Sequence, residues 1–239
     1  MKLHQPIFAD LSTYNPEGSM AFYQNVFGWT FYRKADYYMA YLGDKEVAGL
    51  YETPQKFKQM RMPHFWMTYF RVAHLKESVA KAKALGGIIE LDEEVRGFGK
   101  IALIRDPEGA GFTIYEGGKL KDTRTTQTKN TLVWNELHVS SADAVLPFYR
   151  EVFGWKMEQK TAGYHTLTTA AGEHFGDILE LTHDIKGKYN YWVCTFGVEE
   201  LEKTKNKVLQ NRGSLINEEP ERILLTDDSG EAFFYIKQL

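Results

Sequence analysis

An eight-residue segment occurs twice in this chain, 126 residues apart. Residues 22–29 read Phe-Tyr-Gln-Asn-Val-Phe-Gly-Trp and residues 148–155 read Phe-Tyr-Arg-Glu-Val-Phe-Gly-Trp, so six of the eight positions are identical. A repeat with such a long period indicates that one folding unit has been duplicated. The 239 residues therefore predict two similar domains rather than one large domain.

A polar, threonine-rich stretch without hydrophobic periodicity separates the two copies. It lies between Gly117 and Asn130, and we expect it to be a linker. The predicted organisation is a first domain over residues 1–118, a linker over 119–130 and a second domain over 131–239. Each domain then has about 110–120 residues, which is an ordinary size for one hydrophobic core.

Composition limits the partners that this chain can have. The formal net charge is −3, and lysine and arginine are scattered, so neither nucleic acid nor an anionic membrane is expected as a partner. The single cysteine, Cys194, cannot form a disulfide within the chain, which fits a reducing compartment. The first residues lack the apolar run of a signal peptide, and no apolar segment is long enough to span a bilayer. We expect a soluble, cytoplasmic protein, monomeric or homodimeric, with a small-molecule ligand.

Hydrophobic periodicity predicts the order β-α-β-β-β twice in each copy. The first copy starts with a strand over Pro6–Thr13, followed by a helix that Gly28 ends, and its second helix covers Leu75–Leu85. The helices of the second copy are expected near Ala142–Val152 and Glu200–Asn211. Four such modules predict an α+β fold in which curved mixed sheets carry helices on the outer face. The inner faces are expected to form two concave cups that suit a small molecule.

Several segments resemble the vicinal oxygen chelate (VOC) superfamily, which includes glyoxalase I, extradiol dioxygenases and bleomycin resistance proteins. They are the Phe-Tyr-x-x-Val-Phe-Gly-Trp octets, Gly86-Gly87, Gly-Lys-Ile-Ala at 99–102 and Asp-Pro-Glu-Gly-Ala-Gly-Phe at 106–112. The resemblance covers the chain apart from the linker. It implies tandem VOC domains built from four βαβββ modules, as in two-domain glyoxalase/bleomycin resistance/dioxygenase-like proteins.

The resemblance also implies where a metal would be held. In metal-using members, the ligands come from the first, fourth, fifth and last strands of a domain and face the cup. In this chain those positions hold Phe8, Tyr51, Met67 and Thr113 in the first copy, and Trp134, Glu180, Val193 and Phe234 in the second. Only Glu180 is a carboxylate, and hydrophobic side chains disfavour a hydrated cation. No metal or other cofactor is therefore favoured.

Alternation along the first strand of each copy places a carboxylate in each cup. Phe8 and Asp10 share a face in the first copy, as do Trp134, Glu136 and His138 in the second. A carboxylate on a partly apolar wall is suited to proton transfer, so Asp10 and Glu136 are the candidate catalytic residues. Alternatively, each acid is paired with an arginine or with backbone N–H groups at the end of its strand.

The fifth strand of the first copy adds Tyr69 and Arg71 to the same wall. Arg71 could bind an anionic group of a ligand, pair with Asp10, or lie at a solvated strand end. The candidate ligand-binding residues are Phe8, Tyr51, Met67, Tyr69, Arg71, Thr113, Trp134, His138, Glu180 and Phe234.

Two functions remain open. The favoured one is metal-independent binding, or metal-free chemistry, of a small, partly aromatic or amphipathic molecule against aromatic cup walls. The alternative is a metal-dependent enzyme of the lyase, isomerase or dioxygenase type, with Glu136 as base and a divalent ion on Glu136, His138 and Glu180. Because the polar residues of the two cups differ, we expect unequal sites, of which no more than one is strongly occupied.

Overall fold

The computed structural model describes residues 2–239, and its elements follow the predicted order in all four modules. The first half contains β1 (Pro6–Thr13), α1 (Pro16–Phe27), β2 (Thr30–Lys34), β3 (Tyr37–Leu42), β4 (Lys45–Glu52), α2 (Gln55–Gln59), β5 (Phe65–Arg71), α3 (Leu75–Ala84), β6 (Ile88–Val95), β7 (Gly99–Arg105) and β8 (Gly111–Glu116). The second half contains β9 (Leu132–Val139), α4 (Leu146–Phe153), β10 (Lys156–Thr161), β11 (Tyr164–Thr168), β12 (His174–Glu180), α5 (His183–Lys186), β13 (Tyr191–Val198), α6 (Leu201–Gln210), β14 (Ser214–Glu218), β15 (Arg222–Thr226) and β16 (Phe233–Gln238). None of the helices in residues 2–239 is long and apolar enough to cross a bilayer.

The strands form two mixed sheets of eight strands. Their order is β2-β3-β4-β1-β5-β8-β7-β6 and β10-β11-β12-β9-β13-β16-β15-β14. Within each module the first strand pairs in parallel with the last, and the remaining pairs are antiparallel. This confirms the predicted α+β class and the βαβββ modules. The short helices α2 and α5 are additions that the sequence pattern does not predict.

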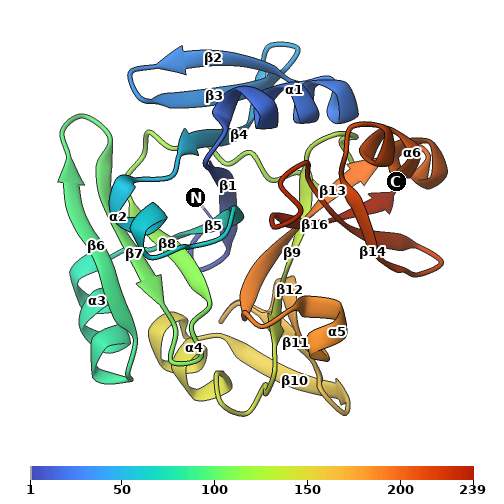
Figure 1. Cartoon of the computed structure of the whole chain (residues 1–239). Coiled ribbons are helices and arrows are strands. Elements are labelled where there is room, and N and C mark those ends of the chain that lie inside the picture. Colours follow the sequence, from blue (N-terminus) through green and yellow to red (C-terminus); the bar gives the residue numbers. More distant parts are fainter. Residues whose placement is uncertain (1) are drawn as a thin grey trace. The chain divides into compact units, whose positions relative to one another are not determined.

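The chain divides into two compact units, and each unit combines one module from each sequence copy. Unit 1 consists of residues 2–7, 68–122 and 135–193, and unit 2 of residues 8–67, 123–134 and 194–239. Helix α3 lies beside α4 in unit 1, and α1 lies beside α6 in unit 2 (Figure 1). The domain boundaries at 1–118 and 131–239 describe the repeat in the sequence and remain a prediction.

The octet of the second copy connects the two modules of unit 1. The Tyr149 hydroxyl donates to Asp106 Oδ2 at 2.9 Å and accepts from Trp192 Nε1 at 3.0 Å. Trp155 Nε1 donates to the carbonyl oxygen of His4 at 2.6 Å, and its ring stacks on Tyr149. Buried hydroxyl and indole groups need such partners, so the octet is a packing motif.

The octet of the first copy makes the same contacts inside unit 2. The Tyr23 hydroxyl donates to Asp227 Oδ2 at 3.4 Å and accepts from Trp66 Nε1 at 3.0 Å. Trp29 Nε1 donates to the carbonyl oxygen of Asn130 at 2.8 Å. Asn130 has a φ of 59°, and His4, which accepts the equivalent hydrogen bond from Trp155 in unit 1, has a φ of 56°. The repeated residues are therefore explained by packing between modules of different copies.

Candidate functional site

The hydrophobic core shows which face of β9 carries the polar candidates. Leu137 and Val139 lie in the core cluster that contains the buried residues of α4. Because side chains alternate along a strand, Glu136 and His138 point to the opposite face. We call this side of each sheet, turned away from the helix-covered core, the polar face. Alternation in the sequence predicts the same assignment of the β9 side chains to the two faces.

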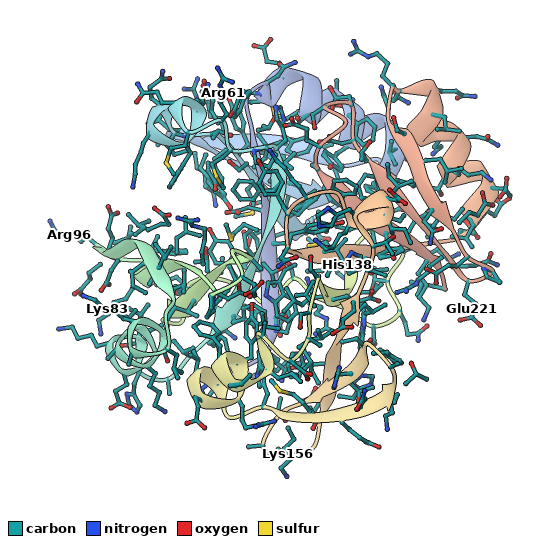
Figure 2. The ribbon with its side chains drawn as sticks, turned by 60° about the horizontal axis from the view of Figure 1, so that its bottom comes forward. Arg61, Lys83, Arg96, His138, Lys156 and Glu221 are labelled. Atoms are coloured by element: carbon teal, nitrogen blue, oxygen red, sulfur yellow. The ribbon has the colours of Figure 1, made fainter. Side chains whose placement is uncertain are left out.

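Glu136, His138 and Tyr191 form a hydrogen-bonded chain on the polar face of unit 1. His138 Nε2 lies 3.4 Å from Glu136 Oε2, and His138 Nδ1 lies 3.4 Å from the Tyr191 hydroxyl. His138, labelled in Figure 2, is fully buried, and Glu136 is 3% exposed. An ionised carboxylate only accepts, so with Glu136 ionised Nε2 carries the proton and Nδ1 accepts from the phenol. Both contacts are long for hydrogen bonds.

A second carboxylate lies beside Glu136. Asp177 of β12 is its register partner on the adjacent parallel strand, so both side chains share the polar face. Asp177 Oδ1 accepts from the Tyr164 hydroxyl at 3.4 Å and lies 3.0 Å from His174 Nε2. Asp177 is not among the residues predicted from the sequence. Alternation along the strand could have identified Asp177, because apolar Ile178 faces the core and the residue before it therefore faces the other side.

The prediction that Glu180 faces this site is wrong. Register pairs Glu180 with Val139, which lies in the core, so the two residues share the face opposite to Glu136. The Glu180 carboxylate accepts a hydrogen bond from the backbone N–H of Ala142 at 2.6 Å. The alternative metal site on Glu136, His138 and Glu180 is therefore contradicted, because its third ligand lies on the other side of the sheet.

Asp10 of β1 holds the equivalent position in unit 2. Ala9 and Leu11 lie in the core, and Asp10 is fully buried on the polar face, as predicted. Its Oδ2 accepts a hydrogen bond from the Tyr37 hydroxyl at 2.9 Å, and the Tyr37 ring stacks on Tyr51. Burial, and then the negative charge of Asp10, raise the pKa of the Tyr51 hydroxyl well above its usual range. Tyr51 is therefore a neutral hydroxyl at physiological pH.

The twelve predicted site residues are divided equally between the two units. Unit 2 contains Phe8, Asp10, Tyr51, Met67, Trp134 and Phe234. Unit 1 contains Tyr69, Arg71, Thr113, Glu136, His138 and Glu180. Register pairs Tyr69 with Thr113 on β5 and β8, and the neighbours of Thr113 on β8 lie in the core, so this pair is on the polar face.

Two of the predicted ligand-binding residues have structural contacts. Arg71 is 6% exposed, and its Nη2 donates to the carbonyl oxygen of Leu120 at 2.7 Å, so it is buried rather than at a solvated strand end. The guanidinium of Arg124, in the predicted linker, lies 5.0 Å from the ring centroid of Trp134. A cation at this distance from a ring is attracted to its face. Arg71 and Trp134 therefore hold the segment between the two copies.

The predicted position of Phe234 is also wrong. Phe234 is fully buried in the helix-side core of unit 2, where its ring centroid lies 6.3 Å from that of Phe22. Its register partner Cys194 lies in the same core cluster. The next residue, Tyr235, takes the polar face of β16, and Arg222 lies 4.4 Å above its ring.

A difference in turn length explains this error. In unit 1 the turn before β8 closes with a hydrogen bond from Asp106 N to Ala110 O, and in unit 2 the turn before β16 closes from Asp227 N to Ala232 O. The second turn is one residue longer. A shift of one residue moves every side chain of the following strand to the other face.

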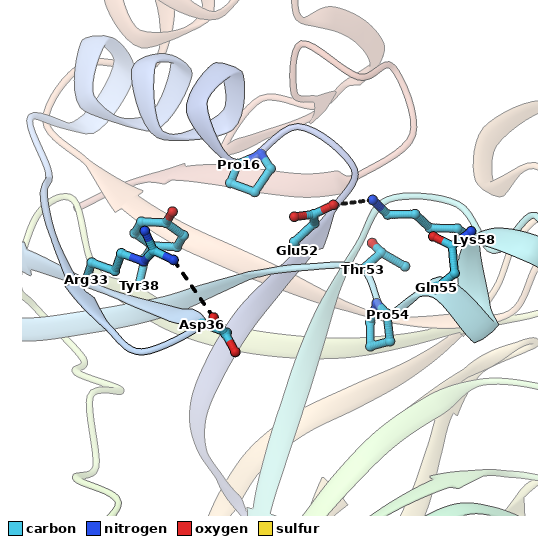
Figure 3. A pocket seen from close by; sticks show the side chains of 9 residues that line it. All are labelled: Pro16, Arg33, Asp36, Tyr38, Glu52, Thr53, Pro54, Gln55 and Lys58. Carbon is cyan, nitrogen blue, oxygen red and sulfur yellow. Dashed lines mark hydrogen bonds and ion pairs between the residues drawn. The ribbon is translucent and has the colours of Figure 1, made fainter.

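A pocket of about 340 Å³ lies in unit 2 on the helix side of the sheet (Figure 3). Tyr38 in its wall packs against the helix-side core. Arg33 forms an ion pair with Asp36 at 3.8 Å, and Lys58 forms one with Glu52. Because these charges are already paired with each other and three of the four side chains are mostly exposed, the pocket gives no reason to place the site there.

The polar faces do not supply a set of metal ligands. In residues 2–239, no group of three or more His, Cys, Asp or Glu side chains is arranged to hold a metal ion. Asp10 accepts a hydrogen bond from a tyrosine hydroxyl, and Glu136 and Asp177 each contact a histidine. The donor set of this chain therefore does not fit the divalent centre that the family resemblance implies.

Sequence comparisons match a family model to the first half of the chain and find relatives that match 97% of it. The family model described as Glyoxalase/Bleomycin resistance protein/Dioxygenase superfamily matches residues 8–114. The putative glyoxylase CFP32 of Mycobacterium bovis is 26% identical over 249 residues, covering 97% of this chain and 94% of the relative. The anthracycline biosynthesis protein DnrV of Streptomyces peucetius is 25% identical over 260 residues, covering 97% and 92%.

Solved structures share the fold at low sequence identity. The Mn(II)-bound glyoxalase from Novosphingobium aromaticivorans has a TM-score of 0.68 at 11% identity, covering 99% of this chain and 82% of the other. The 2,3-dioxygenase LapB from Pseudomonas sp. KL28 has a TM-score of 0.64 at 15% identity, covering 98% and 92%. The match to the Glyoxalase/Bleomycin resistance protein/Dioxygenase superfamily model covers residues 8–114, and the four βαβββ modules carry the same kind of fold through the rest of the described chain.

Proposed function

We propose that this glyoxalase-like protein binds a small, partly aromatic or amphipathic molecule on the polar face of its second copy, without a metal ion. Glu136, His138 and Tyr191 would be the polar anchors of the ligand. The buried carboxylate–imidazole–phenol chain carries this proposal. Its two 3.4 Å contacts are weak enough to be exchanged for shorter hydrogen bonds to a ligand.

A contact of the acid in the first copy is a further reason to place the ligand site in the second copy. The acid of the first copy, Asp10, already accepts a 2.9 Å hydrogen bond from Tyr37. A short bond to a charged group in a buried place costs more to break than a long one. We therefore expect one ligand per chain.

The hydrogen-bonded series Glu136–His138–Tyr191 is also suited to proton transfer. By donating from Nε2, His138 stabilises Glu136 in its ionised form, which can accept a proton from an acidic O–H or C–H group of the ligand. The imidazole in turn is held in this tautomer by the Tyr191 hydroxyl. Metal-free proton transfer at Glu136 is thus the chemistry that accompanies binding.

An anthracycline is a rational first probe. The relative from Streptomyces peucetius is named for anthracycline biosynthesis. Anthracyclines are planar, fluorescent polycyclic molecules with hydroxyl groups, which match aromatic and acidic side chains. Doxorubicin fluorescence titrated with the protein measures affinity and stoichiometry directly.

The test compares Glu136→Gln with the surface variant Glu202→Gln. We expect Glu136→Gln to weaken doxorubicin binding at least about tenfold, because a charged acceptor is lost from a buried site. Glu202→Gln on the exposed side of α6 should bind like the wild type. Equal affinities for both variants, or no binding by the wild type, would contradict the proposed site.

Metal independence has its own test. The wild type is treated with EDTA, analysed for residual metals and titrated again. We expect unchanged binding. Loss of binding that Mn²⁺ restores would overturn the metal-independent part of the proposal.

A further inference from the structure

Two arginines lie on the polar face within residues 68–122 of unit 1, and their surroundings differ. Phe70 lies in the core cluster, so the next residue on β5, Arg71, points to the polar face. Arg105 follows the core residue Ile104 on β7 in the same way. The Nε of Arg105 donates to Glu90 Oε1 at 2.9 Å, and the two side chains form an ion pair. The charge of Arg105 is therefore balanced by a carboxylate.

Arg71 has no such carboxylate. It is 6% exposed, and a guanidinium has five N–H donors and stays protonated in proteins. One of these donors, on Nη2, binds the carbonyl oxygen of Leu120 at 2.7 Å. The buried Nε–H has no hydrogen-bond partner within residues 2–239, and no acid in that range forms an ion pair with the guanidinium. Arg71 is thus a buried positive charge for which the described chain supplies no counterion.

A buried charge of this kind favours the binding of an anion. Removing a charged group from water is strongly unfavourable unless an opposite charge accompanies it, and the attraction between the two is stronger in a buried place than in water. The carbonyl oxygen of Leu120 carries only a partial charge, so it does not neutralise the guanidinium. The parallel N–H groups of arginine match the two oxygens of a carboxylate.

The neighbouring residues of the polar face suit an apolar group attached to that carboxylate. Register pairs Arg71 with Tyr115 on β8, and Tyr115 with Ile101 on β7, so the three side chains share one face. Leu103 lies on the same face of β7, and Ile101 and Leu103 are both partly exposed. Thr113, the register partner of Leu103, adds a hydroxyl group to this surface.

The segment that Arg71 contacts is already held by another residue. The Tyr115 hydroxyl accepts hydrogen bonds from the backbone N–H groups of Lys119 at 2.9 Å and Leu120 at 3.1 Å. It donates to the carbonyl oxygen of Phe98 at 2.8 Å, so its donor and both acceptor positions are in use. Support of residues 119–120 therefore does not by itself explain why a charged side chain is buried at position 71.

We propose that Arg71 binds the carboxylate of a small organic acid whose apolar part lies against Ile101 and Leu103. The anion would supply the counterion that the described chain lacks, and the aliphatic side chains would favour an acid with a hydrocarbon body over a bare anion. This site uses neither Glu136 nor His138. It is therefore independent of the proposed function and takes a different class of ligand.

Calorimetric titration with hexanoate, at constant ionic strength in sodium chloride, tests the site. We expect one hexanoate per chain, and acetate and inorganic phosphate at least about tenfold weaker, because neither has a hydrocarbon body to bury. Absence of hexanoate binding would overturn the proposal. Phosphate or acetate that binds as tightly as hexanoate would overturn the assignment to an organic acid with an apolar body.

Two matched substitutions locate the site. Arg71→Met removes the charge and keeps a long side chain, and we expect it to abolish hexanoate binding. Arg105→Met removes the arginine that is paired with Glu90 on the same face, and it should bind hexanoate like the wild type. Unchanged binding by Arg71→Met, or an equal loss in both variants, would contradict binding at Arg71.

Thermal unfolding separates an anion site from a purely structural arginine. An anion that binds only the folded chain raises its melting temperature, so hexanoate should stabilise the wild type and leave Arg71→Met unchanged. An equal rise in both proteins, or none in the wild type, would refute the site. If Arg71→Met does not fold, Arg71→Lys keeps the charge but lacks the planar fork and should bind hexanoate at least about tenfold more weakly. Wild-type affinity in Arg71→Lys would contradict recognition by the guanidinium.

Discussion

Asp106 shows how a single buried residue couples packing to pH. It is 1% exposed and lies in the turn before β8. Its Oδ1 accepts from the backbone N–H groups of Glu108 and Ala110, each at 2.9 Å, and its Oδ2 accepts from Tyr149. Burial raises the pKa of Asp106 to about 6, although these three hydrogen bonds favour the ionised form. Ionisation of this carboxyl group is therefore less favourable in the folded chain than in the unfolded chain.

The stability of the protein should fall as pH rises through the range in which Asp106 ionises. The pKa of Asp106 is about 6 in the folded chain and 3.8 ordinarily, so the folded chain binds the proton more tightly. The free energy of unfolding then decreases between about pH 4 and pH 6, by on the order of 3 kcal/mol for this group. Asp106→Asn cannot ionise and should remove that part of the decrease.

Urea denaturation across this pH range measures the effect. Burial also raises the pKa of Asp227 to about 6, so Asp106→Asn should remove only part of the decrease, and the double variant with Asp227→Asn more of it. Asp44→Asn, at an exposed turn, serves as the control. An unaltered pH dependence in the double variant would contradict the assignment.

At the scale of elements, the repeated octet ends its helix in the same way in both copies. Gly28 follows α1 with a φ of 75°, and its N–H donates to the carbonyl oxygen of Gln24. Gly154 follows α4 with a φ of 71°, and its N–H donates to Arg150. Glycine adopts this left-handed conformation without strain, and the chain can then turn the following tryptophan into the core.

Alanine at either glycine should destabilise the protein through the backbone alone. No atom lies within 4 Å of a Cβ built on Gly28 or Gly154, so no clash is expected. The left-handed conformation costs an L-residue about 1–2 kcal/mol. We expect each variant to lose about 1 kcal/mol of unfolding free energy in urea. Gly118→Ala, which is equally open and not left-handed, should lose almost none, and equal losses in all three would contradict the explanation.

At the scale of the whole molecule, each compact unit depends on both sequence copies. Unit 1 joins residues 68–122 to residues 135–193, and unit 2 joins residues 8–67 to residues 194–239. The octet tyrosines supply hydrogen bonds between these segments, and the octet tryptophans donate to Asn130 in unit 2 and to His4 in unit 1. Cutting the chain between the copies therefore leaves every one of these contacts in place.

If the chain is cut between its two copies, the two fragments should remain associated. A protease site inserted after Gly118, where the backbone is exposed, allows the cut to be made on folded protein. We expect the two fragments to elute together in size-exclusion chromatography under native conditions and to separate in urea. Separation under native conditions would show that the copies, rather than the mixed units, are the stable bodies.

Several features of the fold could be predicted from local patterns. The long-period repeat predicts four similar modules, and alternation along β1 and β9 places Asp10, Glu136 and His138 on the polar face. These predictions succeed because helical and strand periodicity are properties of neighbouring residues. The glycine that ends α1 is likewise visible as a local signal.

The remaining features depended on contacts between distant segments. Glu180 and Phe234 were placed on the wrong face because strand register depends on turn length and on the partner strand, and one residue reverses the face. The hydrogen bond of Tyr37 to Asp10 and the contact of Tyr164 with Asp177 join residues on different strands. Likewise, no local pattern shows that each compact unit takes one module from each copy. The amino-acid sequence determined by itself what each segment can form, whereas which segments pair, and in which register, was decided only by burial of apolar surface over the whole chain.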